Sequence, residues 1–108
     1  MKEDLIEYYP NGGKKYKMSF YPNGNKWHEQ YYDRRGYGHR ASGLPDYHCW
    51  YENNISHFKT YYVHGDEHNI HNPSFIRFIN NGKIRVKSYY LNGQKYSKLN
   101  WQSVIKNI

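Results

Sequence analysis

Histidines are the residues whose number and spacing first suggest chemistry. The chain has seven of them, and His64, His68 and His71 lie close together in the sequence. Two histidines four residues apart on a helix can bind one zinc ion. Gly65 and Pro73 accompany this segment, however, and both favour a turn and a linker over a helix. Because no second group of cysteine or acidic residues completes a tetrahedral set, we expect no metal site and no cofactor.

Nucleophilic and carboxylate chemistry finds little support in the sequence. The only cysteine, Cys49, follows His48 in a strand-like run. Neighbouring side chains on a strand point to opposite faces of a sheet, so His48 is badly placed to activate the thiol. A buried structural thiol is the simpler interpretation. Asp66 and Glu67 lie in an expected turn, and Asp33 is followed by arginines, so we expect the protein not to be an enzyme.

Composition limits the protein to one small domain. The chain has 108 residues, a formal net charge of +7, and 14 Tyr, 3 Trp and 4 Phe. Its mean hydropathy of -1.17 is low, but aromatic side chains can form a core, and disordered chains have few of them. A lone cysteine allows no internal disulfide, and no apolar run follows the first charges or reaches membrane-spanning length. We expect a single cytoplasmic domain over residues 1–108.

A repeated aromatic ending followed by a tight turn is the main pattern in the chain. Residues 8–12 and 20–24 read Tyr-Tyr-Pro-Asn-Gly and Phe-Tyr-Pro-Asn-Gly. Related endings place further turns at positions 36, 54, 65, 82 and 93, and the distances from 54 to 82 and from 65 to 93 are both 28 residues. Such a period indicates a two-strand unit that recurs along the chain.

The segments between the turns have the features of strands. Residues 83–90 alternate charged with apolar side chains, the two-residue period of a half-buried strand. Asn-Gly pairs favour the type I′ turn, in which both central residues have positive φ. The pattern changes at Ser97, a suitable helix N-cap. We expect a mainly β fold of consecutive antiparallel hairpins over residues 6–96, with a capping helix over residues 97–108 whose apolar stripe contains Leu99, Trp101, Val104, Ile105 and Ile108.

These features resemble degenerate MORN-type repeats of bacterial, phage and large-virus proteins. The resemblance lies in the Tyr-Tyr-x-Asn-Gly endings, in the histidines that follow two of the turns, His39 and His68, and in the linkers that run on to Pro45 and Pro73. It implies a single-layer or elongated sheet of hairpins that is used for protein or membrane contacts. The recurrence of His39 and His68 at one repeat position favours a structural hydrogen bond to the linker backbone.

Binding is the remaining class of function. Exposed Tyr, Trp and Arg dominate protein interfaces, and aromatic residues among cations can also bind unpaired nucleic acid. The main hypothesis is a small phage or mobile-element adaptor or inhibitor that grips a host protein with an acidic surface, and the alternative is a nucleic-acid-binding protein. Strand alternation places three predicted binding residues on one face, extended by two from neighbouring strands, with three arginines as a second surface: Lys83, Arg85 and Lys87, then Arg77 and Lys59, then Arg34, Arg35 and Arg40.

Overall fold

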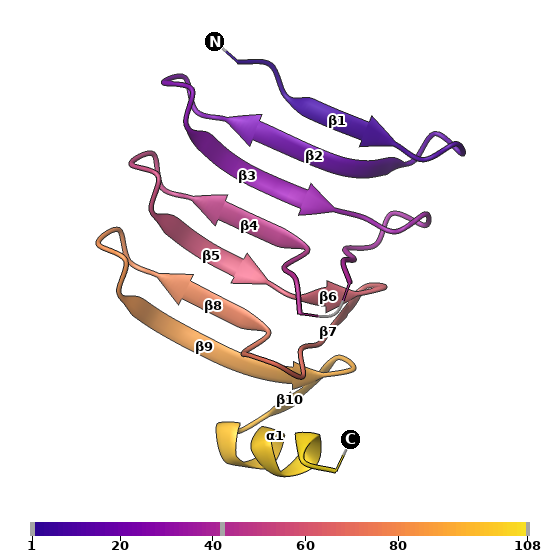
Figure 1. Ribbon diagram of the computed structural model, residues 1–108, viewed down its shortest axis with the longest axis vertical. Helices are drawn as coiled ribbons and strands as arrows, with labels where there is room; N and C mark the ends of the chain where they lie inside the picture. The colour runs from indigo at the N-terminus through magenta and orange to yellow at the C-terminus, as the bar shows by residue number, and fades with distance from the viewer. Residues whose placement is uncertain (1, 42, 108) are drawn as a thin grey trace.

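The computed structural model describes residues 2–41 and 43–107 of the chain. Within these residues the structure is a single-layer antiparallel sheet of eight strands in the order β1-β2-β3-β4-β5-β8-β9-β10, with a separate β6-β7 hairpin and one helix (Figure 1). The elements are β1 (Leu5–Tyr8), β2 (Lys14–Phe20), β3 (Lys26–Tyr31), β4 (Tyr47–Trp50), β5 (Ser56–Thr60), β6 (Tyr62–Val63), β7 (Asp66–Glu67), β8 (Phe75–Phe78), β9 (Ile84–Leu91), β10 (Gln94–Tyr96) and α1 (Lys98–Ile105). The described part measures 47 × 40 × 15 Å. This confirms the mainly β fold of consecutive hairpins with a C-terminal helix.

Most of the long hairpins close through a three-residue loop with a bulge. The Gly12 N–H donates to the Tyr9 carbonyl at 2.9 Å, the Tyr9 N–H donates to the Gly13 carbonyl at 2.8 Å, and Gly12 has a φ of 88°. The same bonds recur over residues 21–25, 33–37, 51–55 and 79–83. A glycine with positive φ that ends a type I turn and begins a bulge is the usual three-residue hairpin.

The type I′ prediction is therefore wrong for the Asn-Gly pairs at these loops. Asn-Gly alone does not choose between the two turns, because both need a positive φ at the glycine. Positive φ occurs at both central residues in His64-Gly65 (49° and 87°) and in Asn92-Gly93 (50° and 82°), where the loops have two residues.

Side chains join successive turns along each edge of the sheet. The Tyr21 hydroxyl donates to the Trp50 carbonyl at 2.7 Å, and the Asn25 amide donates to the Glu52 carbonyl at 2.8 Å. Two further tyrosine hydroxyls and two further asparagine amides reach the next turn on their edge in the same way, from Tyr9, Tyr51, Asn11 and Asn53. We call this set of contacts the turn ladder, and it explains why the aromatic residue and the asparagine recur together.

The helix α1 covers the end of the last hairpin, as the sequence predicts. Trp101 is 6% exposed, its ring lies 5.0 Å from that of Tyr89, and its Nε1 donates to the Asn69 carbonyl at 2.9 Å. Ser97 is the N-cap, since its hydroxyl accepts the Asn100 N–H. These contacts form the main apolar cluster of the described residues.

The apolar stripe expected on α1 is only partly buried. Ile105 packs beside Trp101, but Leu99 and Val104 are 79% and 38% exposed, so the prediction that they face the sheet is wrong. A helix of eight residues against two strands has little surface to cover, and Trp101 takes most of it. Ile108, also expected in the stripe, lies outside the described residues.

The strand register gives the sheet two different faces. On one face the rings of His28, Tyr47, Phe58 and Phe75 follow one another, with centroid distances of 5.9, 5.4 and 5.9 Å. We call this the aromatic face. The other we call the lysine face, because cross-strand pairing places there a row formed by Glu29, His48, Lys59, Ile76 and Lys87.

Candidate binding site

The five residues predicted to form one binding face do not share a face. Lys59 and Lys87 flank Ile76 on the lysine face. Arg77 pairs with Phe58 and Val86, which belong to the aromatic face. The prediction that Arg77 extends the face of Lys87 is therefore wrong, because the register of β8 against β9 is one residue away from the one assumed.

A bulge also interrupts the alternation assumed for β9. Arg77 pairs with Val86 and Phe78 with Ile84, so Arg85 is the extra residue. Side chains do not alternate regularly across a bulge. Lys83 precedes β9, and its backbone carbonyl closes the loop by accepting the Ile79 N–H. These cations do not form one continuous patch.

His48 is packed against its neighbours on the lysine face. Its ring stacks on Trp50 at 3.9 Å, and its Nε2 lies 2.9 Å from the Ser56 hydroxyl. Burial, with the nearby charges of Lys59 and Lys26, lowers the pKa of His48 to about 4. This residue is neutral near pH 7 and adds no charge to the face.

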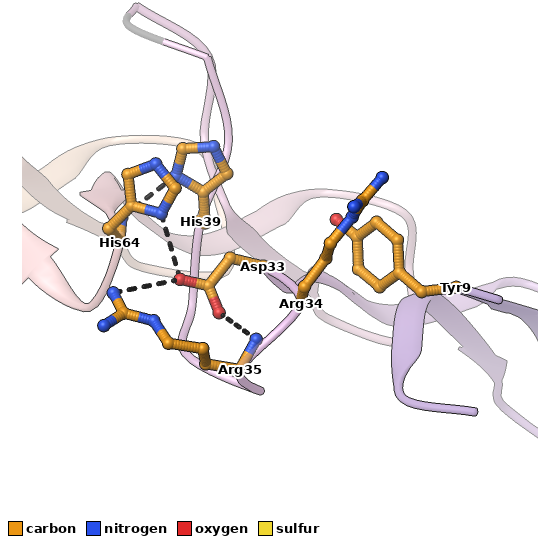
Figure 2. Close-up of a pocket in the computed structure, with 6 residues that line it drawn as sticks. All are labelled: Tyr9, Asp33, Arg34, Arg35, His39 and His64. Atoms are coloured by element: carbon orange, nitrogen blue, oxygen red, sulfur yellow. Dashed lines mark hydrogen bonds and ion pairs between the residues drawn. The ribbon is translucent and has the colours of Figure 1, made fainter. Parts of the chain in front are cut away.

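The turn over residues 33–37 brings two of the predicted arginines to a cavity. The cavity has a volume of about 490 Å³ and is lined by Tyr9, Asp33, Arg34, Arg35, His39 and His64 (Figure 2). Its walls come from the β1-β2 loop, the loop after β3 and the β6-β7 hairpin, so three separate segments build it. We call it the arginine cavity. Arg40 lies elsewhere, with its guanidinium 4.0 Å above the Tyr31 ring.

Asp33 is the carboxylate of the arginine cavity, and its oxygens are fully engaged. Oδ1 accepts the backbone N–H groups of Arg35 and Tyr37 at 2.9 and 3.0 Å. Oδ2 lies 3.0 Å from His64 Nδ1 and 3.8 Å from the Arg35 guanidinium. Burial opposes ionisation, but the hydrogen bonds from His64, Tyr37 and Arg35 outweigh it and lower the pKa of Asp33. The negative charge is thus used to hold the turn and the histidine.

His39 and His64 stack in the cavity wall with ring centroids 3.9 Å apart. His39 Nδ1 accepts the backbone N–H of His64 at 2.9 Å, so the proton of a neutral His39 is on Nε2. Burial and then the charge of His64 lower the pKa of His39. His68 Nδ1 accepts the Asn92 N–H at 3.0 Å in the same way. Both histidines therefore hold the next turn, whereas the sequence pattern favoured a bond to the linker.

Arg34 is the least engaged cation of the cavity. Its guanidinium lies 5.7 Å from the centre of the Tyr9 ring, and among the described residues no carboxylate forms an ion pair with it. Sequence reasoning named Arg34 and Arg35 but missed Tyr9 and His64 as their neighbours. The only sequence signal was the spacing of the repeat, which places corresponding turns on one edge of the sheet.

Comparison of the chain with family models, with curated proteins and with solved structures gave no match. In the part of the chain that the structure describes, no three His, Cys, Asp or Glu side chains are grouped to hold a metal ion. No helix in the same part is long and apolar enough to cross a membrane.

Proposed function

We propose that the protein is a non-enzymatic binding module that receives an acidic group of another protein in the arginine cavity. The observation that carries this proposal is the meeting of Arg34, Arg35, His39 and His64 around a cavity whose one carboxylate, Asp33, already accepts hydrogen bonds from the turn and pairs with Arg35. Arginines suit carboxylate recognition because the planar guanidinium donates in pairs. An adaptor or inhibitor that grips an acidic protein surface would use such a site.

Direct nucleic-acid binding has weaker support. Base stacking needs exposed ring faces, but on the aromatic face His28, Tyr47 and Phe58 direct their ring faces at one another, with interplanar angles of 15° and 20°. The cations are also divided between the two faces of the sheet. Neither feature favours a groove that follows a phosphate backbone.

The proposal is tested with a fluorescent octaglutamate peptide, using anisotropy at about 50 and 200 mM salt, with octalysine and single-stranded DNA as comparison ligands. We expect Arg34→Glu to weaken octaglutamate binding roughly tenfold. This variant keeps the contacts of Asp33, because they involve the Arg35 and Tyr37 backbones and His64.

Lys83→Glu is the matched control, since it makes the same change of charge in an exposed loop away from the cavity. It should bind octaglutamate nearly as well as the unchanged protein. Equal losses in the two variants would mean that only net charge matters, which overturns the site. Tighter binding of DNA that Arg34→Glu does not alter would overturn the proposed function itself.

A further inference from the structure

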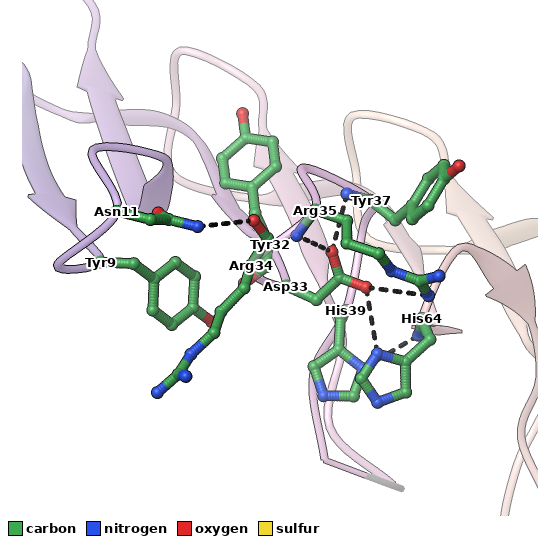
Figure 3. Close-up of polar contacts among 9 residues, drawn as sticks. All are labelled: Tyr9, Asn11, Tyr32, Asp33, Arg34, Arg35, Tyr37, His39 and His64. Atoms are coloured by element: carbon green, nitrogen blue, oxygen red, sulfur yellow. Dashed lines mark hydrogen bonds and ion pairs between the residues drawn. The ribbon is translucent and has the colours of Figure 1, made fainter.

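A second cavity lies on the other side of the same turn. It has a volume of about 350 Å³ and is lined by Gln30, Tyr32, Gly36, Tyr37, Gly38, Asp46, Thr60, Tyr62 and Gly65. Gln30 and Thr60 both pair with Tyr47, which places this cavity at the end of the aromatic face. Figure 3 shows the Tyr32 and Tyr37 rings pointing away from the rings of Tyr9, His39 and His64. We call this second cavity the tyrosine cavity.

A buried carboxylate forms part of the wall of the tyrosine cavity. Asp46 is 3% exposed; its Oδ1 accepts the Thr60 hydroxyl at 2.8 Å and its Oδ2 accepts the Gln30 amide at 2.9 Å. Both donors are neutral, and no cation of the described residues pairs with it. A buried charge without a counter-ion is unfavourable, and burial accordingly raises the pKa of Asp46.

The backbone hydrogen bond of the repeat at this position does not depend on a carboxylate. Asp46 donates its backbone N–H to the Thr60 carbonyl, and Ser74 makes the same bond to Ser88 in the next repeat. Gly38 leaves room for the carboxylate, since a Cβ there would lie 2.6 Å from Asp46 Oδ2. In the next repeat Ser74 carries no charge itself and donates its hydroxyl to the Glu67 carboxylate. Asp46 differs in that it supplies the carboxylate itself, against a glycine that makes space for it.

The surrounding rings fit a cation with apolar substituents. Aromatic faces attract ammonium groups, and Tyr32 and Tyr62 line the same cavity as Asp46. Tyr37 already carries a cation, because the Arg35 guanidinium lies 5.0 Å from its ring centre. A metal ion is a poor fit, since no three ligating side chains of the described residues are grouped here.

We propose that the tyrosine cavity binds an alkylammonium group, with the charge at Asp46 and the alkyl carbons against Tyr32 and Tyr62. The ligand would supply the counter-ion that Asp46 lacks and would bury its carbons against the rings. This site does not depend on the arginine cavity, which recognises the opposite charge on the other side of the turn.

The test is an NMR titration of the unchanged protein with tetramethylammonium and with neopentyl alcohol, a neutral molecule of nearly the same shape. We expect saturable shifts of the Gly38 and Thr60 amides with the cation and none with the alcohol. Asp46→Asn should weaken tetramethylammonium binding roughly tenfold, and Tyr62→Leu should weaken it, while Tyr62→Phe, which keeps the ring, should not.

Equal responses to the cation and to the alcohol would overturn the proposal, and this comparison needs no variant to fold. Undiminished binding by a folded Asp46→Asn protein would also overturn it. Glucose serves as a further probe, because binding of the sugar but not of the cation would assign the cavity to a neutral polyol. Titration with Nα-acetyl-lysine methylamide and its trimethylated form then tests whether the alkylammonium group belongs to a lysine side chain or to a small free amine.

Discussion

At the scale of single residues, His39, His48 and His68 serve as hydrogen-bond acceptors or packed rings. His39 and His68 each hold the backbone N–H of a following turn at Nδ1, which requires that nitrogen to be unprotonated. His48 is packed against Trp50 beside two lysines. Burial lowers the pKa of His39 and of His48, so protonation of these two rings opposes the folded arrangement and acid should weaken the fold.

The clearest test concerns His48, whose pKa is lowered to about 4 from the ordinary value of 6.5. The unfolded chain takes up this proton at a higher pH than the folded one, so stability falls as pH drops from 6.5 towards 4. We expect His48→Phe, which keeps the ring stacked on Trp50, to make this fall shallower in urea unfolding measured across that range.

The same substitution at the exposed His71 is the control for placing a phenylalanine elsewhere on the surface. Other histidines contribute to the slope, because burial also lowers the pKa of His28, His39 and His57. An identical slope for His48→Phe and the unchanged protein would contradict the assignment of His48.

At the scale of elements, the hairpin loops depend on one residue with positive φ. Glycine fills this position at Gly12, Gly24, Gly36 and Gly82, whereas Asn54 fills it with a φ of 73° in the loop between β4 and β5. Asparagine tolerates this conformation better than most residues, but glycine adopts it without steric cost. The side chains that reach the next turn from this loop belong to Tyr51 and Asn53, so Asn54 is not needed for the turn ladder.

We therefore predict that Asn54→Gly stabilises the protein by about 0.5–1 kcal/mol, offset in part by the greater freedom of glycine in the unfolded chain. The converse change, Gly82→Ala, should destabilise by about 1 kcal/mol or more. No atom of the described residues lies within 4 Å of a Cβ built there, so its effect would come from the backbone alone. Thermal unfolding of both variants measures these changes. A lower melting temperature for Asn54→Gly would show that the Asn54 side chain makes a stabilising contact.

At the scale of the whole molecule, a sheet one layer thick gains its stability from neighbouring hairpins, as repeat proteins do. Each inner hairpin is held on both sides by the turn ladder and by strand pairing. The first and last hairpins lack a neighbour on one side and are therefore the least stable parts of the sheet. β9 and β10 end the sheet under α1, with Tyr89, Leu91 and Trp101 in one buried cluster. The helix thus replaces the next repeat.

Trp101→Ala should cost roughly 3–5 kcal/mol, because it removes a buried ring and the donor to the Asn69 carbonyl. We expect hydrogen exchange to rise first in β9 and β10, with smaller changes in β2 and β3. Leu99→Ser, on the exposed side of the same helix, is the matched control and should change stability by less than about 0.5 kcal/mol. Equal protection losses in all strands would mean that the sheet unfolds as one unit.

The architecture could be predicted because its causes are local in the sequence. A two-residue period, a turn glycine and a capping Ser97 each act over a few residues, and the recurrence of Tyr and Asn before the turn reveals the repeat. The equivalence of His39 and His68 was visible for the same reason. The sequence identified Arg34 and Arg35 as candidate binding residues, but it did not show which other residues would lie beside them in the fold.

Register and loop type were decided by the tertiary structure. A bulge of one residue moved Arg77 away from Lys87 and left Arg85 unpaired, and nothing in the local sequence distinguishes that register from the regular one. The two cavities also depend on long-range alignment. The arginine cavity joins the β1-β2 loop, the loop after β3 and the β6-β7 hairpin, and the tyrosine cavity joins β3 and the loop after it to β5 and the β6-β7 hairpin. Sequence determined the hairpins, and long-range pairing determined which side chains they bring together.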